Sequence, residues 1–274
     1  MTHVRAHAKL NLALVVGPRR EDGLHELASV VQRIELADDL DVEPAQELSV
    51  EGFDDDTLVR EALRALAEES GAEPRVRVAI GKRIPLAAGL GGGSADAGVV
   101  LAAANQLLPD PLPRDRLITV AARVGSDVPF FLEPGAKLVE GAGERLTALD
   151  LPRDYAVVLA LPHDAAKAST ARVYARFDEL GGGAHFEQRR DELVRALVAV
   201  RAGRDLIALP PNDLGEAAGR PALLDELRAA GAFRADVAGA GPAVYGLFPR
   251  RDEAQFAARH LAARAETWVT SPVW

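Results

Sequence analysis

The sequence predicts an α+β fold in two domains, and three observations lead to this prediction. The chain has 274 residues, which is long for one hydrophobic core and short for three. Stretches with strand alternation and stretches with helical periodicity are mixed, without the regular alternation of strand and helix that builds a doubly wound sheet. A short Leu-Pro-Arg-Asp segment at 151–154 separates the two halves. We therefore expect one domain over residues 1–150 and a second over 151–274.

The first domain is expected to begin with a long strand over Val4–Val16. Apolar side chains recur at every second position from Val4 to Leu14, which indicates one buried face, while Lys9 and Asn11 belong to the polar face. Apolar periodicity also predicts strands over 27–36, 40–43 and 76–80, helices over 57–69, 95–108 and 117–124, and loop and strand over 136–149.

The second domain is expected to contain a sheet with Tyr155–Leu161 as a central strand. This stretch is almost continuously apolar, which is typical of a strand buried on both faces. Around it the sequence predicts helices over 170–180, 186–202, 223–230 and 254–265, and a strand–turn–strand hairpin over 236–248.

Composition and charge argue against several classes of function. Acidic residues outnumber basic ones by 41 to 32, and the formal net charge of −9 repels nucleic acid and anionic membranes. Aromatic residues make up only 5%, too few for stacking platforms on single-stranded nucleic acid. No apolar run is long enough to span a bilayer, and the N-terminus lacks the apolar stretch of a signal peptide. We therefore expect a cytoplasmic protein with a small-molecule partner, either monomeric or homodimeric.

Disulfides, thiolate metal sites and a cysteine nucleophile are excluded, because the chain has no cysteine. The six histidines are scattered, and the only close pair is His3 and His7, so the sequence predicts no cluster of metal ligands.

The strongest motif is the glycine-rich segment Pro85–Ala97. Its four glycines in five positions, Gly89 and 91–93, allow backbone N–H groups to approach an anion closely. The helix expected next points its N-terminus, with its partial positive charge, at the same place. The segment is neither a Walker A motif, because no Gly-Lys-Ser/Thr follows, nor a Rossmann fingerprint, because Ser94 replaces the last glycine. A simple turn needs only one or two glycines, so we interpret the segment as a phosphate-binding loop.

Three weaker patterns could belong to the same site. Lys9 and Asn11 lie about 7 Å apart on one strand face and could touch one ligand, although such a pair alone is more typical of a solvated face. Asp127 precedes Val-Pro-Phe-Phe, so we expect it beside apolar packing, as a functional acid or as the cap of a short helix. Gly239–Pro242 indicates either backbone close to a ligand or a tight turn.

Taken together, these motifs resemble the GHMP kinase superfamily over nearly the whole chain. Within it, the chain is most similar to kinases whose acceptor is a cytidyl-diphospho derivative of methylerythritol. The segments that carry the resemblance are Ala8–Leu12, Arg20–Glu26, Pro85–Ala97, Gly125–Phe131, Ser169–Tyr174, Asn212–Leu214 and Gly239–Pro242. The resemblance implies a cleft between a ribosomal-S5-like N-terminal domain and a ferredoxin-like C-terminal domain.

The resemblance also implies the reaction and its catalytic residues. ATP with Mg²⁺ would donate a phosphoryl group to the C2 hydroxyl of the methylerythritol unit, a step of the non-mevalonate route to isoprenoid precursors. Asp127 would accept the hydroxyl proton, and Lys9 would steady Asp127 and the transferring group.

Binding roles follow by position from the same resemblance. Asn11 and His25 would orient the acceptor, whose cytosine would lie between Tyr174 and an aliphatic wall that includes Leu24. Ser94 would lie near Mg²⁺, and no protein metal ligand is assigned with certainty. The loop residues that would contact ATP are Pro85, Ala88, Gly89, Leu90, Gly91, Gly92, Gly93 and Ser94.

At several positions the chain departs from the family pattern. These departures are Leu24 for Tyr, Val31 for Phe, Ala238 for Ser, Thr57 for Asn and His7 for Pro. Leu24 bears most on the substrate, because the usual tyrosine stacks on cytosine, whereas Tyr174 keeps the second stacking position. Two alternatives stay open: a kinase for another small alcohol, and a non-catalytic protein with this fold, against which the presence of Lys9 and Asp127 argues.

Overall fold

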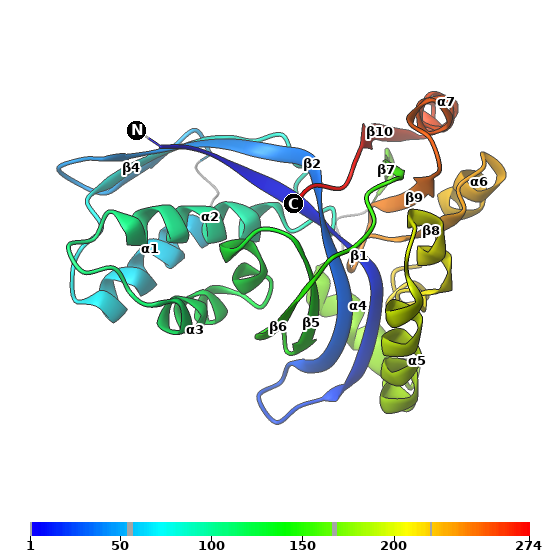
Figure 1. Ribbon diagram of the computed structural model, residues 1–274, viewed down its shortest axis with the longest axis horizontal. Coiled ribbons are helices and arrows are strands. Elements are labelled where there is room, and N and C mark those ends of the chain that lie inside the picture. Colours follow the sequence, from blue (N-terminus) through cyan, green and yellow to red (C-terminus); the bar gives the residue numbers. More distant parts are fainter. Residues whose placement is uncertain (1, 54–56, 166–168, 220) are drawn as a thin grey trace.

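Two β-sheets of unequal size divide the chain (Figure 1). The computed structural model describes residues 2–53, 57–165, 169–219 and 221–274. In this part of the chain the larger sheet has six strands and the smaller has four, and helices pack on both. The mixture of helices and strands, without a doubly wound order, confirms the predicted α+β class. No helix among the described residues combines the length and the apolar character needed to cross a bilayer.

The N-terminal half builds the larger sheet and the helices on it. In chain order its elements are β1 (Thr2–Arg19), β2 (His25–Pro44), β3 (Ser49–Glu51), α1 (Thr57–Ser70), β4 (Val76–Gly81), α2 (Gly92–Gln106), α3 (Arg114–Val124), the 3₁₀ helix η1 (Val128–Leu132), β5 (Ala136–Gly141) and β6 (Arg145–Leu149). The strands predicted over 27–36 and 40–43 are one continuous strand, β2. Helix α2 begins at Gly92, three residues before the predicted start.

The C-terminal half builds the smaller sheet. Its elements are β7 (Ala156–Pro162), α4 (Thr170–Glu179), α5 (Phe186–Ala199), the 3₁₀ helix η2 (Gly203–Ala208), α6 (Leu223–Ala229), β8 (Arg234–Val237), β9 (Val244–Phe248), α7 (Arg251–Leu261) and β10 (Ala265–Thr270). Strand β7 pairs with β9 on one side and β10 on the other, so its predicted central place is confirmed. Strand β10 was not predicted. The predicted division after residue 150 falls in the connection between β6 and β7; that it separates two independently folding domains stays a prediction.

The long strand β2 organises the larger sheet. Strand β1 pairs antiparallel with it along almost its whole length. On its other edge, β5 pairs with 27–31 and β4 pairs with 39–44. Strands β1 and β2 therefore form a ribbon that runs from the helices α1–α3 toward the C-terminal half (Figure 1).

Irregularities in this ribbon change which side chains face the core. The β1–β2 register shifts between His7 and Lys9 and again between Asn11 and Ala13. A shift of one residue moves the following side chains to the opposite face. Leu14 consequently packs in a different apolar cluster from Leu12, so the predicted common face of these two residues is wrong.

One of the buried hydrophobic clusters contains side chains from both halves. Leu10 and Leu12 of β1 pack in the same buried cluster as Leu159 of β7 and Tyr245 of β9. The Tyr245 hydroxyl donates a hydrogen bond to the carbonyl oxygen of Asn11 at 3.0 Å. Strand β1 is therefore fixed to the second sheet at the residues that carry the predicted site.

Helices cover the remaining faces of the two sheets. Helices α1, α2 and α3 share a core with the larger sheet and with η1, and α6 and α7 cover the smaller sheet. Helix α2 approaches η1 closely at Gly98, where a Cβ atom would lie 2.6 Å from the Cβ atom of Phe131. This contact brings the glycine-rich segment and the Asp127 segment together.

Candidate active site

A cleft of about 740 Å³ collects the predicted site residues. Its walls come from β1, the glycine-rich segment, η1 and the first turns of α4. Every residue predicted for the site lines it: Lys9, Asn11, Leu24, His25, Pro85, Ala88, Gly89, Leu90, Gly91, Gly92, Gly93, Ser94, Asp127 and Tyr174. The fold thus brings together residues that are far apart in the sequence.

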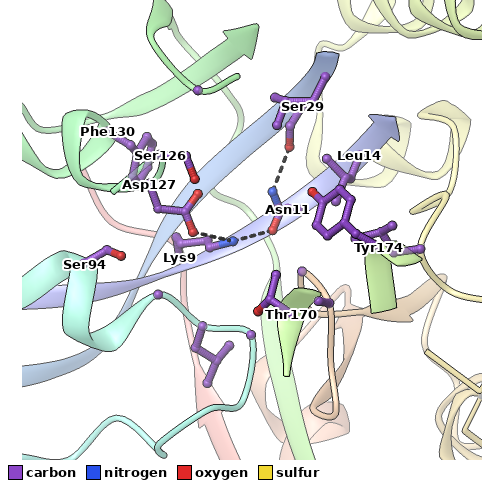
Figure 2. A pocket seen from close by; sticks show the side chains of 18 of the residues that line it. Lys9, Asn11, Leu14, Ser29, Ser94, Ser126, Asp127, Phe130, Thr170 and Tyr174 are labelled. Atoms are coloured by element: carbon purple, nitrogen blue, oxygen red, sulfur yellow. Dashed lines mark hydrogen bonds and ion pairs between the residues drawn. The ribbon is translucent and has the colours of Figure 1, made fainter. Parts of the chain in front are cut away.

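Lys9 lies at the centre of a polar chain on the cleft floor (Figure 2). Its Nζ donates to Asn11 Oδ1 at 2.7 Å and lies 3.4 Å from Asp127 Oδ2. Asn11 in turn donates to Ser29 Oγ at 2.8 Å. Lys9 and Asn11 are only 6% and 5% exposed, so the solvated strand face considered for them is wrong. Both ends of the Asn11 amide are already hydrogen-bonded, and this fixes where the ammonium of Lys9 points.

Asp127 is the accessible member of this group. Its side chain is 50% exposed and lies at the start of η1, with the buried rings of Phe130 and Phe131 behind it. It occupies the cap position of this short helix, but its carboxylate makes no capping hydrogen bond. The capping role considered for Asp127 therefore does not account for its side chain, which faces Lys9 instead.

The glycine-rich segment is held by backbone contacts on both sides. The N–H of Lys9 donates to the carbonyl of Leu90, and the N–H of Ala243 donates to the carbonyl of Ala88. Gly89 has a φ of +82°, and a Cβ atom there would lie 1.9 Å from the carbonyl oxygen of Ala238. Both the backbone conformation and the packing therefore require glycine at this position.

The start of α2 forms one side of the cleft. Gly91 precedes the helix in the left-handed conformation and provides no side-chain cap. The next residues, 92–94, line the cleft. The first N–H groups of a helix lack intrahelical partners, so this end of α2 has the character of an anion site.

The hairpin between β8 and β9 approaches the same point from the second sheet. A Cβ atom at Gly239 would lie 2.9 Å from the carbonyl oxygen of Gly89 and 3.4 Å from Lys9 Nζ. The buried side chain of Asn212 donates to the carbonyls of Gly239 and Val237 at 2.6 and 3.0 Å and so holds the turn. Gly239–Pro242 is thus a tight turn that packs closely against Gly89, and its approach to a ligand stays a prediction.

A buried charge cluster beside the loop was not singled out in the sequence. Lys82 Nζ donates to Asp38 Oδ2 and to Asp96 Oδ2, both at 2.6 Å, and both carboxylates are completely buried. The other oxygen of Asp38 accepts from the backbone N–H groups of Arg83 and Ile84 at 2.5 and 2.8 Å. Burial lowers the pKa of Lys82, but the carboxylates outweigh it and the net pKa is raised. The cluster fixes residues 82–84, which lead into the glycine-rich segment.

Lys82→Met is expected to destabilise the protein by about 3–5 kcal/mol, because it leaves two buried carboxylates without their cation. Urea denaturation would measure the change. Arg77→Met is the control, since Arg77 also binds two carboxylates but lies exposed on β4, where ion pairs contribute little. Equal losses for the two variants would contradict the structural role of the buried cluster.

The far end of the cleft is aromatic and contains a pair that links the two halves. His25 Nε2 is hydrogen-bonded to Asp178 Oδ1 at 2.8 Å, and its ring lies 4.9 Å from that of Tyr174 and 6.2 Å from that of Phe177. Burial, and next the charge of Asp127, raise the pKa of the Tyr174 hydroxyl. Leu24 is 49% exposed at the cleft edge. Asp178 was missed in the sequence.

The positions that depart from the family pattern lie in different structural environments. Val31 lines the cleft, and Thr57 is the first residue of α1. Ala238 is fully buried behind Gly89. His7 Nδ1 is hydrogen-bonded to the carbonyl of Ile34 at 2.9 Å, and burial lowers its pKa.

Comparison with known proteins agrees with this geometry. Residues 57–135 match the family model for the GHMP kinase N-terminal domain, and residues 221–267 match that for the GHMP kinase C-terminal domain. A 4-diphosphocytidyl-2-C-methyl-D-erythritol kinase of Geobacter metallireducens is 36% identical, with 98% of this chain and 96% of the relative covered. One of Streptomyces coelicolor is 39% identical, over 87% of this chain and 85% of the relative.

Solved structures extend the agreement to the whole fold. A crystal structure of 4-(cytidine 5'-diphospho)-2C-methyl-D-erythritol kinase matches with a TM-score of 0.81 and 33% identity, and all of both chains is covered. A mevalonate kinase matches with a TM-score of 0.72 at 13% identity, over 99% of both chains, which shows the shared fold alone. At more than 30% identity over nearly its full length, the chain belongs to the 4-diphosphocytidyl-2-C-methyl-D-erythritol kinase family within the GHMP kinases.

Proposed function

We propose that this protein transfers the terminal phosphoryl group of ATP to the C2 hydroxyl of 4-diphosphocytidyl-2-C-methyl-D-erythritol. The observation that carries the proposal is the Lys9–Asp127 pair, which lines the same cleft as the glycine-rich segment. The bond between the terminal phosphorus and its bridging oxygen breaks, and the acceptor oxygen forms the new bond to phosphorus. ADP leaves, and the hydroxyl proton passes to Asp127.

The pair suits this chemistry because phosphoryl transfer depends mainly on positioning and on stabilisation of charge. The half-exposed carboxylate of Asp127 is accessible to an acceptor hydroxyl, whereas Lys9 is buried and held by Asn11. Lys9 therefore provides a fixed positive charge beside the point where negative charge is transferred. Fixed charges of this kind contribute most in sites that exclude water.

The donor side of the cleft has the features that ATP needs. The uncapped start of α2 provides N–H groups for phosphate, and we assign the phosphates to it and to the glycine-rich segment that precedes it. Among the described residues, no group of three or more His, Cys, Asp or Glu side chains is arranged to hold a metal ion. This fits Mg²⁺, which is usually held by substrate phosphates and one or two protein oxygens. We assign the hydroxyl of Ser94 to it, and the ion would neutralise charge on the phosphates.

The direct test is a phosphoryl-transfer assay with purified protein, ATP and Mg²⁺. The cytidyl-methylerythritol acceptor is compared with mevalonate and homoserine at equal concentrations. We expect the highest kcat/KM for the cytidyl acceptor. Faster transfer to one of the other alcohols would replace the proposed substrate, and no transfer to any of them would reject the kinase assignment for this chain.

The cytosine pocket gives a second prediction. If the base lies against Tyr174, Tyr174→Ala should raise the KM for the acceptor about tenfold, because an aromatic contact contributes roughly 0.5–1.5 kcal/mol beyond buried area. Leu24→Tyr should lower this KM by adding an aromatic face at the cleft edge. In both variants kcat should change little, since neither side chain touches the transferring group.

Steady-state kinetics with varied acceptor would measure both changes. Leu107→Tyr is the control for Leu24→Tyr, because Leu107 is a comparably exposed leucine outside the cleft. An unchanged KM in both Tyr174→Ala and Leu24→Tyr would place the base elsewhere.

A further inference from the structure

Arg33 is a buried cation of β2 that the proposed reaction does not use. The residue is 6% exposed, and burial lowers its pKa to about 10, so it is charged at neutral pH. Burial is the cause of this shift, and no carboxylate in the described part of the chain contributes to it. A buried charge without a counter-charge is costly, and an apolar side chain of similar size would usually serve stability as well or better. Its contacts show what the guanidinium does instead.

The guanidinium of Arg33 binds the backbone of the Asp127 segment. Its Nη2 donates to the carbonyl of Phe130 at 3.0 Å and to the carbonyl of Glu133. The same group lies over the rings of Phe130 and Phe131, with its Cζ atom 5.3 and 5.7 Å from their centroids. Arg33 therefore holds the C-terminal part of η1 through hydrogen bonds to main-chain carbonyls and through contacts with the two aromatic rings.

The backbone of Arg33 is fixed in turn by the C-terminal tail. The N–H of Val273 donates to the carbonyl of Arg33 at 3.0 Å, and Gln32 Nε2 donates to the carbonyls of Arg33 and Val273 at 2.9 and 2.8 Å. The tail follows β10 of the smaller sheet. The segment of β2 that carries Arg33 is thus fixed by hydrogen bonds to the C-terminal half of the chain.

The contacts between Arg33 and η1 lie only a few residues from Asp127 and restrict its position. Asp127 directly precedes η1, a five-residue 3₁₀ helix with proline in its first turn, so the segment has little freedom to bend independently. Phe130 lines the cleft beside Asp127 (Figure 2). We propose that Arg33 is a positioning residue, which holds η1 so that the carboxylate of Asp127 stays opposite Lys9. This inference rests on the proposed role of Asp127.

Lys137 provides a matched comparison. It is also a buried cation near Phe130, with Nζ 6.0 Å from the ring centroid. Its hydrogen bond goes to the carbonyl of Pro134 at 2.9 Å, beyond the end of η1. Removing its charge should therefore leave the Asp127 carboxylate in place.

The test compares kcat for phosphoryl transfer in Arg33→Met and Lys137→Met, each in the wild-type and the Asp127→Asn background. Arg33→Met should lower kcat roughly 10–100-fold, since small displacements of a catalytic group cost this much, with the KM for ATP within about threefold of wild type. In the Asp127→Asn background the same substitution should lower kcat less than about twofold, because the group it positions is gone. Lys137→Met should leave kcat within about threefold in both backgrounds. Melting curves establish that the variants are folded.

Several outcomes would overturn the inference. A folded Arg33→Met with wild-type kcat would do so, and so would equal fold-losses in the two backgrounds, which indicate a general structural effect. If Arg33→Met does not fold, Arg33→Lys, which keeps the charge but can bind fewer carbonyls, is judged by the same comparison of backgrounds. If Asp127→Asn alone keeps the wild-type kcat, the proposed base is rejected. If Asp127→Asn lowers kcat but Arg33→Met does not, only the positioning role of Arg33 is rejected.

Discussion

Asp127→Asn is expected to slow phosphoryl transfer by about 10²–10⁴-fold, the usual contribution of a general base. Asparagine keeps the size of the side chain but cannot accept the hydroxyl proton. The fold should be preserved, because the Asp127 side chain is half exposed and its carboxylate makes no capping hydrogen bond in η1. ATP affinity should also be preserved, since the phosphates are assigned to the glycine-rich segment and the start of α2 and not to Asp127. Single-turnover kinetics would measure the chemical step, and calorimetry the affinity.

Asp115→Asn is the control for the change in net charge. Asp115 lies in the first turn of α3 with its side chain 95% exposed, outside the cleft. This variant should transfer phosphate at the wild-type rate. An Asp127→Asn enzyme within a few-fold of wild type would show that Asp127 is not the base.

Gly89→Ala is expected to eliminate measurable ATP binding. Alanine in the left-handed conformation costs roughly 1–2 kcal/mol, and its methyl group would also meet the carbonyl oxygen of Ala238 at 1.9 Å. Neither backbone can yield without separating the glycine-rich segment from the β8–β9 hairpin. Because the carbonyl of Leu90 accepts a hydrogen bond from the backbone of Lys9, the disturbance would also reach strand β1. ATP titration by calorimetry, paired with a melting curve, would measure the loss.

Gly71→Ala is the control that separates the effect of backbone strain from that of the steric clash with Ala238. Gly71 has a similar φ of +69°, but a Cβ atom there would have no neighbour within 4 Å. This variant should lose about 1 kcal/mol of stability from the strained backbone alone and bind ATP normally. If Gly89→Ala behaves like Gly71→Ala, the contact with Ala238 does not support the phosphate site.

The sequence was sufficient for the elements whose periodicity is strong. The helix predicted over 57–69 and the strand over 76–80 lie within one residue of α1 and β4. The prediction was wrong within β1, because register shifts at Lys9 and Ala13 depend on pairing with β2 and leave no trace in local periodicity. Strand β10 was missed because its alternation, AETWVT, is short and half polar.

The sequence motifs were sufficient to predict site residues that all line one cleft. They did not predict the contacts that hold these residues in place. Lys82 and Asp38 are 44 positions apart, and His25 and Asp178 are 153 apart, so only the folded chain shows that they pair. The four loop glycines also look alike in the sequence. The structure distinguishes Gly89, which meets backbone, from Gly92, whose Cβ would meet the Ile84 side chain at 3.1 Å.

The hydrogen bond from Tyr245 to the carbonyl of Asn11 has a consequence for how the protein folds. The two residues are separated by 234 positions, so the contact closes a loop that contains most of the chain. Contacts of such long sequence separation form late and slow the folding of domains that depend on them. Catalytic competence should therefore return after most secondary structure during refolding, and an intermediate with a formed N-terminal sheet would still be inactive.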